Sequence, residues 1–268
     1  MSEELPVPRD EWQLSTHLLG RRVLVYERLD STNNRAALLA ADPANEGIVI
    51  IADEQTAGRG QHGRSWVSHP GLGVWLSVLL FPPLELRRPV ILAAWAAYSV
   101  CEAIRHITNL QATIKWPNDV LIRGRKVCGI LVEQGRGTVV GIGLNVNQKE
   151  SAFADSGLTQ AGSLAIMIGQ NFQCAAVART LIHTLDEEYH RLCQGDLATL
   201  ESCWKRQMGL LGKQVTVECH RTSHHGRLRG FGWDGIQLDL ENGGTLRLVP
   251  ETVTHITESR TSLKDSGG

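Results

Sequence analysis

The sequence predicts an α+β fold, in which a mixed β-sheet with helices is followed by a small β-barrel. In the larger part of the chain the predicted strands cluster in runs and do not alternate singly with helices, an order typical of α+β domains. After residue 211 the predicted strands become short and evenly spaced, and Asp-Gly and Asn-Gly-Gly turns separate them. We therefore expect a loose lead-in over 1–20, a large domain over 21–210, a small barrel over 211–259 and a disordered tail over 260–268.

Hydrophobic periodicity and turn residues define the elements in the first half of the large domain. The apolar runs at 22–27, 47–54 and 73–80 predict strands, and the patterns at 33–41 and 86–107 predict helices. The first helix follows an Asp-Ser-Thr run, whose side chains commonly cap helix N-termini. The second helix is apolar, but its apolar stretch is too short to span a bilayer and contains polar residues, so we expect a core helix.

Strands dominate the second half of the large domain until two helices close it. The expected strands lie at 112–116, 120–122, 126–134 and 138–145, with a tight hairpin turn at 123–125. Amphipathic patterns predict helices at 173–193 and 197–207. The strands of the small barrel are expected at 215–217, 226–231, 235–238 and 246–249.

Composition and charge exclude several classes of protein. Lys and Arg number 27 and Asp and Glu 28 in 268 residues, so no basic excess argues for a nucleic-acid-binding protein. Residues 1–20 are too few for a winged-helix DNA-binding module. The six cysteines include no C-x-x-C pair, and the N-terminus carries acids and a proline where a signal peptide carries basic and apolar residues. We therefore expect a cytoplasmic protein with reduced thiols that binds neither nucleic acid nor a membrane.

The segment 58–66, which reads GRGQHGRSW, is the most informative about function. Its glycines let backbone N–H groups approach a ligand closely, and Arg59 and Arg64 offer planar charged groups that match phosphate or carboxylate oxygens. The pattern indicates a loop that wraps a small anion, and a solvated surface turn is the alternative. The run also satisfies G-x-G-x-x-G, but strand-like residues 65–68 stand where a dinucleotide fold requires a helix.

Three further segments carry side chains suited to chemistry. Residues 115–119 (KWPND) place a Lys, an Asn and an Asp around a proline corner, which suits a metal-bound phosphate, although a turn with a packed Trp gives the same pattern. The strand 125–133 carries one lysine, Lys126, which is either a solvated hairpin residue or a group that stabilises charge in a transition state. The run 141–147 combines glycines with amides that can hydrogen-bond a base edge.

Other conspicuous residues are better explained by packing. The Cys and His residues at 219–225 are metal-ligand types, but no fourth partner stands at zinc spacing. Cys128 alternates with small and apolar neighbours and is expected to be a packed residue. Trp75, Trp95 and Trp204 are likewise expected in the core.

Together, five segments resemble biotin protein ligases in order, residue type and spacing. They are 30–33, 54–66, 115–119, 126–133 and 141–147, and the resemblance extends over about residues 22–258. It implies a class II synthetase-like catalytic domain of the biotin/lipoate ligase type, followed by an SH3-like barrel. It also implies the activity. The biotin carboxylate attacks the α-phosphate of ATP to give biotinyl-5′-AMP and pyrophosphate, and a lysine of a biotin carboxyl carrier protein then takes the biotinyl group.

The resemblance implies a role for each matching residue. The residues expected at biotin are Ser31, Thr32, Asn33, Gln55, Gly58, Arg59, Lys126 and Gly129. Those expected at the nucleotide are Arg59, Arg64, Trp66, Asn118, Lys126 and Asn145, with Trp66 stacked on the adenine. Lys126, Arg59 and Arg64 are the expected catalytic residues, because the substrates supply the reacting groups and the enzyme positions them and stabilises charge. Asn118 and Asp119 are expected to hold Mg²⁺ through the ATP phosphates.

The chain departs from the family pattern at Gln61, which stands where the loop usually has a second Arg, so one charge is missing from its hold on the adenylate. Without a DNA-binding module a repressor role is not expected, and a monofunctional ligase is predicted. Two alternatives stay open: a lipoate or octanoate ligase or transferase of the same superfamily, and a non-catalytic biotin or nucleotide sensor. A homodimer is also open.

Overall fold

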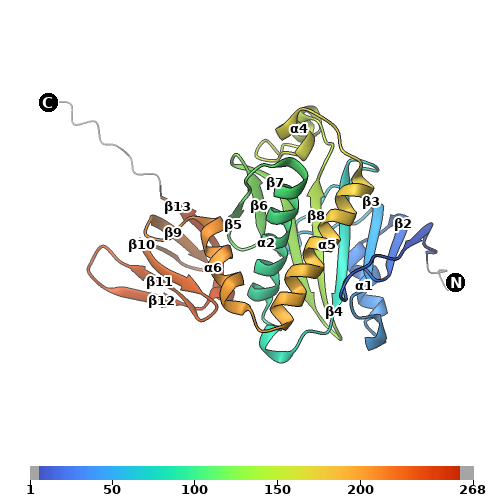
Figure 1. Cartoon of the computed structure of the whole chain (residues 1–268). Coiled ribbons are helices and arrows are strands. Elements are labelled where there is room, and N and C mark those ends of the chain that lie inside the picture. The colour runs from blue at the N-terminus through green and yellow to red at the C-terminus, as the bar shows by residue number, and fades with distance from the viewer. Residues whose placement is uncertain (1–5, 260–268) are drawn as a thin grey trace.

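A computed structural model describes residues 6–259 of the chain, and it contains two β-sheets with helices packed against the larger one (Figure 1). The tail predicted to be disordered, 260–268, lies outside the described residues. Both predicted parts of the fold are present, so the α+β class is confirmed.

The larger sheet has eight strands in the order β1-β2-β3-β4-β8-β7-β6-β5. Their bounds are β1 Asp10–Trp12, β2 Val23–Leu29, β3 Val49–Gln55, β4 Gly73–Leu80, β5 Thr113–Lys115, β6 Asp119–Ile122, β7 Arg125–Gln134 and β8 Thr138–Asn145. β2 and β3 are parallel and the other neighbours are antiparallel, so the sheet is mixed, as the sequence predicts. The central strands β4, β7 and β8 carry the glycines and polar residues that later form the site.

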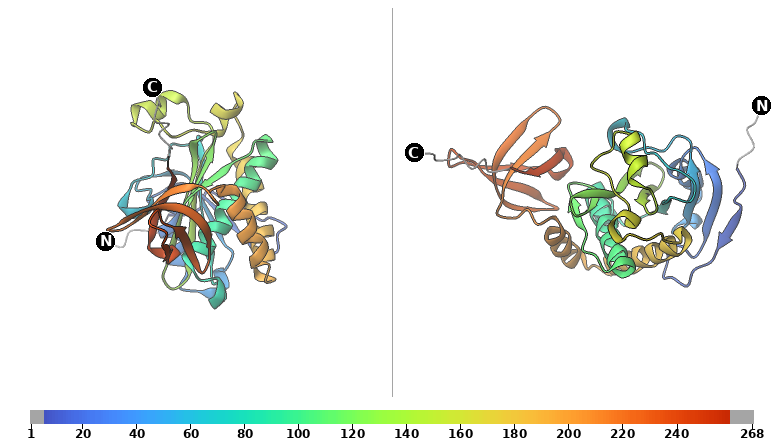
Figure 2. Two further views of the ribbon diagram at one scale, coloured as in Figure 1. Left: turned by 90° about the vertical axis from the view of Figure 1, so that its left-hand side faces the viewer. Right: turned by 90° about the horizontal axis from the view of Figure 1, so that it is seen from above.

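Six α-helices accompany this sheet in the described part of the chain. They are α1 Thr32–Leu39, α2 Pro89–Thr108, α3 Glu150–Asp155, α4 Leu164–Ile168, α5 Cys174–Cys193 and α6 Leu197–Met208. α2 and α5 pack side by side on one face of the sheet (Figures 1 and 2). α1 packs on the opposite face, where its Ala36 joins a second apolar cluster with Tyr26 and Ile50. Both faces of the sheet are therefore covered in part, and the site occupies the face of α1.

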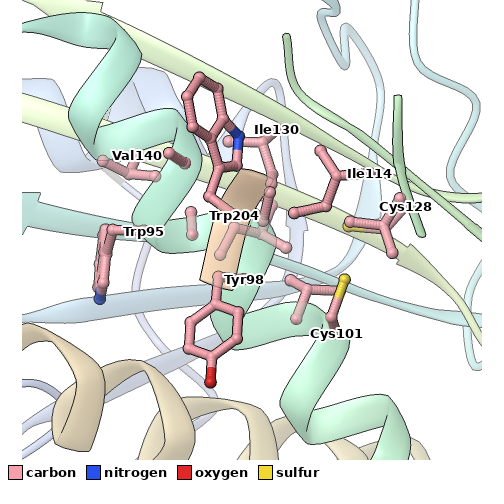
Figure 3. Close-up of a cluster of buried hydrophobic side chains, with 14 of the residues drawn as sticks. Trp95, Tyr98, Cys101, Ile114, Cys128, Ile130, Val140 and Trp204 are labelled. Atoms are coloured by element: carbon pink, nitrogen blue, oxygen red, sulfur yellow. The ribbon is translucent and has the colours of Figure 1, made fainter. Parts of the chain in front are cut away.

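α2 is the central helix of the core. By length and composition it could cross a membrane, but 78% of its apolar window is buried inside the protein, so the predicted core helix is confirmed. Its side chains, Trp95 and Cys101 among them, pack against the sheet residues Cys128 and Ile130 (Figure 3). Burial raises the pKa of the Cys128 thiol, in keeping with the packed residue that the sequence predicts. Trp75, Trp95 and Trp204 are buried as well, so the prediction of core tryptophans is confirmed.

The second sheet has five antiparallel strands in the order β12-β11-β10-β9-β13 and is consistent with the predicted SH3-like barrel. Their bounds are β9 Gln214–Cys219, β10 Ser223–Gly232, β11 Gly235–Asp239, β12 Thr245–Leu248 and β13 Val253–Glu258. Trp204 of α6 stacks on Trp233 with ring centroids 4.9 Å apart. Trp116 Nε1 donates to the carbonyl oxygen of Val253 at 3.0 Å. The two sheets therefore share one apolar core.

The expectation of a loose lead-in over 1–20 is wrong for its described part. Residues 10–12 form β1 on the edge of the larger sheet. The backbone N–H groups of His17, Leu18 and Leu19 donate to the carboxylate of Asp186, at 2.6, 2.8 and 2.7 Å. Asp186 is only 2% exposed, and three N–H donors satisfy its buried charge. Because this partner is on α5, far along the chain, local sequence patterns did not reveal it.

Candidate active site

A cavity of about 280 Å³ opens on the face of the larger sheet that carries α1. Cys128 and Ile130 point toward α2 (Figure 3), and because strand side chains alternate, Gly129 between them faces the cavity. The sequence-predicted site residues that line it are Ser31, Thr32, Asn33, Gln55, Arg59, Arg64, Trp66, Asn118, Asp119, Lys126, Gly129 and Asn145. Gly58 lies behind the lining, where an added Cβ would meet the carbonyl oxygen of Trp66 at 2.5 Å.

One end of the cavity is polar and is built from the start of α1 and the end of β3. The Thr32 N–H and hydroxyl both contact Oε1 of Gln55, at 2.8 and 3.1 Å. Ser31 precedes the helix, and its side chain makes no capping hydrogen bond. Ser31, Thr32 and Asn33 are all nearly fully buried. A few convergent polar groups in a mainly apolar cavity are what a small ligand needs for a fixed orientation.

The Gly/Arg segment forms a narrow hairpin across the cavity. Arg59 and Ser65 pair as an isolated bridge, and the N–H of Gly60 donates to the carbonyl oxygen of Arg64 at 2.6 Å. The Arg59 side chain turns to the sheet, where Nη2 lies 3.0 and 2.9 Å from the two carboxylate oxygens of Glu133. Its Nη1 donates to Oδ1 of Asn34 at 2.6 Å. The guanidinium is thus held at the cavity wall by protein groups.

Trp66 lies flat against the sheet because two glycines leave room for its ring. A Cβ on Gly143 would meet Cε2 of Trp66 at 2.5 Å, and one on Gly129 would meet Cζ3 at 2.7 Å. The edge of Trp66 also meets Trp75, with ring centroids 6.2 Å apart and planes at 68°. Its buried Nε1 has no hydrogen-bond partner among the described residues. Steric contacts therefore position the ring, and its N–H group has no hydrogen-bond acceptor among the described residues.

Lys126 lies between a carboxylate and an aromatic face. Its Nζ is 2.7 Å from Oδ1 of Asp119 and 5.3 Å from the centre of the Trp66 ring. The backbone is fixed at the same place, since the N–H of Lys126 donates to Gln160 and its carbonyl oxygen accepts from Gly162, both at 2.8 Å. A lysine held in this way presents a point charge at the cavity wall.

Two of the expected nucleotide ligands are engaged in contacts within the protein. Asn118 donates from Nδ2 to the carbonyl oxygen of Ile130, and the N–H of Ile130 donates back to its carbonyl oxygen at 3.1 Å. Asn145 donates to the carbonyl oxygen of Gly162 at 3.0 Å and accepts from Gln148 Nε2 at 3.0 Å. Both amides therefore shape the cavity wall as it stands.

Ser77, Glu133 and His255 are among the residues of the site region that were not expected from the sequence. Ser77 on β4 and Glu133 on β7 connect the polar end to Arg59 through hydrogen bonds. His255 lines the cavity from β13, so the second sheet contributes to the site. Its Nδ1 is buried without a partner among the described residues, and burial lowers the pKa of its imidazole below the usual range. No motif could reveal His255, because only the docking of the two sheets brings it there.

Comparisons with known proteins agree with this geometry. The model of the biotin/lipoate A/B protein ligase family matches residues 25–147. A bifunctional ligase/repressor BirA of Bacillus subtilis is 32% identical over 241 residues, which are 88% of this chain and 74% of that protein. A biotin–[acetyl-CoA-carboxylase] ligase of Paracoccus denitrificans is 30% identical over 233 residues, 83% of this chain and 95% of that one. The structure of an Aquifex aeolicus biotin protein ligase with biotin and ATP superposes with a TM-score of 0.76 at 28% identity, covering 88% of this chain and 99% of that one.

Proposed function

The chain belongs to the biotin/lipoate A/B protein ligase family, and we propose that it ligates biotin to a carrier protein. In the first step the biotin carboxylate attacks the α-phosphate of ATP, and biotinyl-5′-AMP and pyrophosphate form. In the second step the amine of an acceptor lysine attacks the biotinyl carbonyl, and AMP leaves. Both nucleophiles come from substrates, so the enzyme contributes position and charge.

The observation that carries this proposal is the cavity with two chemically different ends. At one end Thr32 and Gln55 form a buried hydrogen-bonding corner suited to the ureido ring of biotin. At the other end Arg64, Lys126 and the Trp66 ring line the wall, which suits a phosphate beside an aromatic base. Arg59 also lines the cavity, and we assign it to the biotin carboxylate and the α-phosphate.

The residues at the corner of β5 and β6 fit a phosphate-bound magnesium ion. Asp119 is the only carboxylate among the described residues that line the cavity, and no group of three metal-binding side chains occurs in the described chain. Mg²⁺ that bridges phosphates needs only one or two protein oxygens, because it keeps water and phosphate ligands. Asp119 would hold the ion, with the neighbouring Asn118, and the ion would supply charge stabilisation to the phosphates.

The acceptor and the compartment are part of the proposal. The Paracoccus relative is named for acetyl-CoA carboxylase, which supports a biotin carboxyl carrier protein as the acceptor. ATP and such a carrier are both available in the cytoplasm, the expected location. We expect no nucleic-acid ligand for the described domains. Sedimentation distinguishes a monomer from a homodimer.

The test is pyrophosphate release from ATP in the presence of biotin, lipoate or octanoate, followed by transfer to a carrier protein. We expect pyrophosphate release with biotin but not with lipoate or octanoate, followed by labelling of the carrier. Release with lipoate or octanoate in its place would assign the chain to the other branch of the family. Tight biotin binding without any release would make it a sensor.

A further inference from the structure

Gln148 carries a buried hydrogen-bond acceptor that no described residue satisfies. Its side chain lines the cavity, and the residue is only 5% exposed. Nε2 donates to Oδ1 of Asn145 at 3.0 Å, whereas Oε1 has no hydrogen-bond partner among the described residues. A buried polar atom without a partner costs free energy, and a donor on a ligand in the cavity would remove that cost.

The carbonyl oxygen of Gly162 fixes which atom of Gln148 is left unpaired. A carbonyl oxygen can only accept, so the Asn145 atom 3.0 Å from it is the Nδ2 donor. Oδ1 of Asn145 therefore faces Gln148, and because it can only accept, Gln148 must present Nε2 to it. The remaining atom of the Gln148 amide is the acceptor Oε1. Turning over either amide would bring two acceptors together.

Alternate residues of β8 extend along the length of the cavity. At Gly141 an added Cβ would meet the start of α1, which forms the polar end, and at Gly143 it would meet the Trp66 ring. Asn145 is the next residue on this face, about 7 Å farther along the strand. Gln148, which is bonded to Asn145, therefore lies beyond the Trp66 ring and away from the polar end.

The surroundings of Gln148 suit the amine of a stacked base. A base on the Trp66 ring directs its edge to residues beyond the ring, and the 6-amino group of adenine is a hydrogen-bond donor. α3 lines the cavity with Ala152 and Phe153, whose side chains offer no competing donor. Because Oε1 is already buried, an amine that bonds to it displaces little water from it, so the bond contributes near the upper end of the usual range.

We propose that Gln148 recognises the 6-amino group of ATP, with Asn145 as a positioning residue that orients its amide. This inference rests on the proposed function, in which Trp66 stacks on the adenine. A site that bonds an amine discriminates against a nucleotide that lacks it, since Oε1 then stays buried and unpaired. Gln148 thus sets the preference for the base of ATP and does not add affinity for every nucleoside triphosphate.

The experiment compares ATP with purine riboside triphosphate, which has a hydrogen in place of the 6-amino group. Calorimetry measures the affinity for each in the presence of magnesium and biotinol, the alcohol analogue of biotin, which lacks the reacting carboxylate. We expect the wild type to bind ATP about tenfold more tightly. In Gln148→Met, which keeps the length of the side chain but removes the acceptor, this ratio should fall to within about twofold of one.

Two further variants separate base recognition from general damage. Asn147 lies in the same segment outside the cavity lining, and its amide donates to and accepts from the Phe172 backbone at 2.8 and 2.9 Å. Asn147→Ala should keep the wild-type ratio even where it lowers both affinities. Asn145→Ala, which leaves the Gln148 amide free to turn over, should lower the ratio.

The outcomes distinguish base recognition from the proposed function. A wild-type ratio within about twofold of one, or a ratio in Gln148→Met equal to that in Asn147→Ala, would overturn the role of Gln148 and leave a bound water as the partner of Oε1. A purely structural role would lower both affinities and leave their ratio intact, which also counts against it. Failure of the wild type to release pyrophosphate with biotin and ATP would instead overturn the proposed function, and the biotinol titrations need no turnover.

Discussion

Lys126 has two neighbours that restrict where its charge can lie, the Asp119 carboxylate and the Trp66 ring. We expect Lys126→Ala to bind biotin but to form adenylate about a hundredfold more slowly or worse, the scale of losing one charge-stabilising group. Single-turnover pyrophosphate release measures this. Lys205 is a matched control, since it pairs with Glu201 and lies over the Phe231 ring, outside the cavity lining. Equal losses in Lys126→Ala and Lys205→Ala would remove Lys126 from the mechanism.

Gln61 lines the cavity at the tip of the Gly/Arg hairpin, where the family usually has Arg. A mixed anhydride stays protected only while the loop holds its phosphate and excludes water, and each Arg–phosphate contact adds to that hold. We therefore expect the wild type to leak more biotinyl-adenylate than Gln61→Arg. The measurement is labelling of an unrelated protein with the carrier omitted. Equal or greater leakage by the variant contradicts this reading.

Motifs in the sequence predicted many residues that line the cavity, but not those that lie behind it or reach it from the second sheet. Thr32, Arg59 and Lys126 belong to segments whose composition indicates chemistry, so the sequence alone pointed to them. Ser77 is one serine in an apolar strand, and its importance depends on which face of β4 it occupies. His255 stands in a sheet that the sequence assigned to a separate domain.

At the scale of elements, β7 and β8 form a flat surface for the Trp66 ring, because glycines occupy the two positions under it. Gly129 and Gly143 are register partners, so both gaps lie side by side under the ring. We expect Gly143→Ala to displace Trp66 and to weaken nucleotide binding at least tenfold more than biotin binding. A loss of about 1.4 kcal/mol of binding free energy for the nucleotide alone corresponds to this factor of ten. Calorimetry with each ligand separately tests this. Gly135→Ala is the control, because an added Cβ there meets nothing within 4 Å. A uniform loss of both affinities would argue against the assigned role of Trp66.

The sequence patterns predicted the two longest helices with bounds close to those observed. α2 and α5 each run for 20 residues and show their apolar stripe several times. β1, α3, α4 and β13 were not expected, because each has only three to six residues, too few to show a repeat of any period. The equally short strands β5, β6 and β12 were expected, because turn residues mark their ends. β13 is defined by pairing with β9, whose residues precede it by more than thirty positions, and such partners are invisible to a local pattern.

At the scale of the whole molecule, Trp204 joins the two sheets. It is fully buried and contacts Trp116 on one side and Phe231 and Trp233 on the other. We expect Trp204→Ala to lower the free energy of unfolding by about 3–5 kcal/mol, the usual loss for a buried aromatic residue. Urea unfolding followed by circular dichroism measures it. Leu84→Ala, at a side chain that is 78% exposed, should change stability by less than about 0.5 kcal/mol.

The burial of His255 between the two sheets makes the free energy of unfolding depend on pH. Burial lowers the pKa of His255 below its ordinary 6.5, while Glu218 and Asp119 raise it and Lys115 and Arg64 lower it. Between the lowered value and 6.5 the unfolded chain binds more protons than the folded one, so the free energy of unfolding must fall as the pH falls through this window. Above pH 6.5 the contribution of His255 to the free energy of unfolding is constant. Denaturation curves from pH 5 to 8 should show a shallower slope in His255→Asn, and an identical slope would contradict the assignment.

The contact between the two sheets at Trp204 has a practical consequence for engineering. The chain between α6 and β9 includes Leu211, which is 57% exposed, so a break there would separate Trp204 from Phe231 and Trp233 at an accessible position. One piece would then carry Trp204 and Lys126, and the other would carry Trp233 and His255. Reassembly would restore a complete cavity only when both pieces meet. The protein is thus a natural candidate for a split reporter, in which proximity of two fused partners is recorded as covalent biotin.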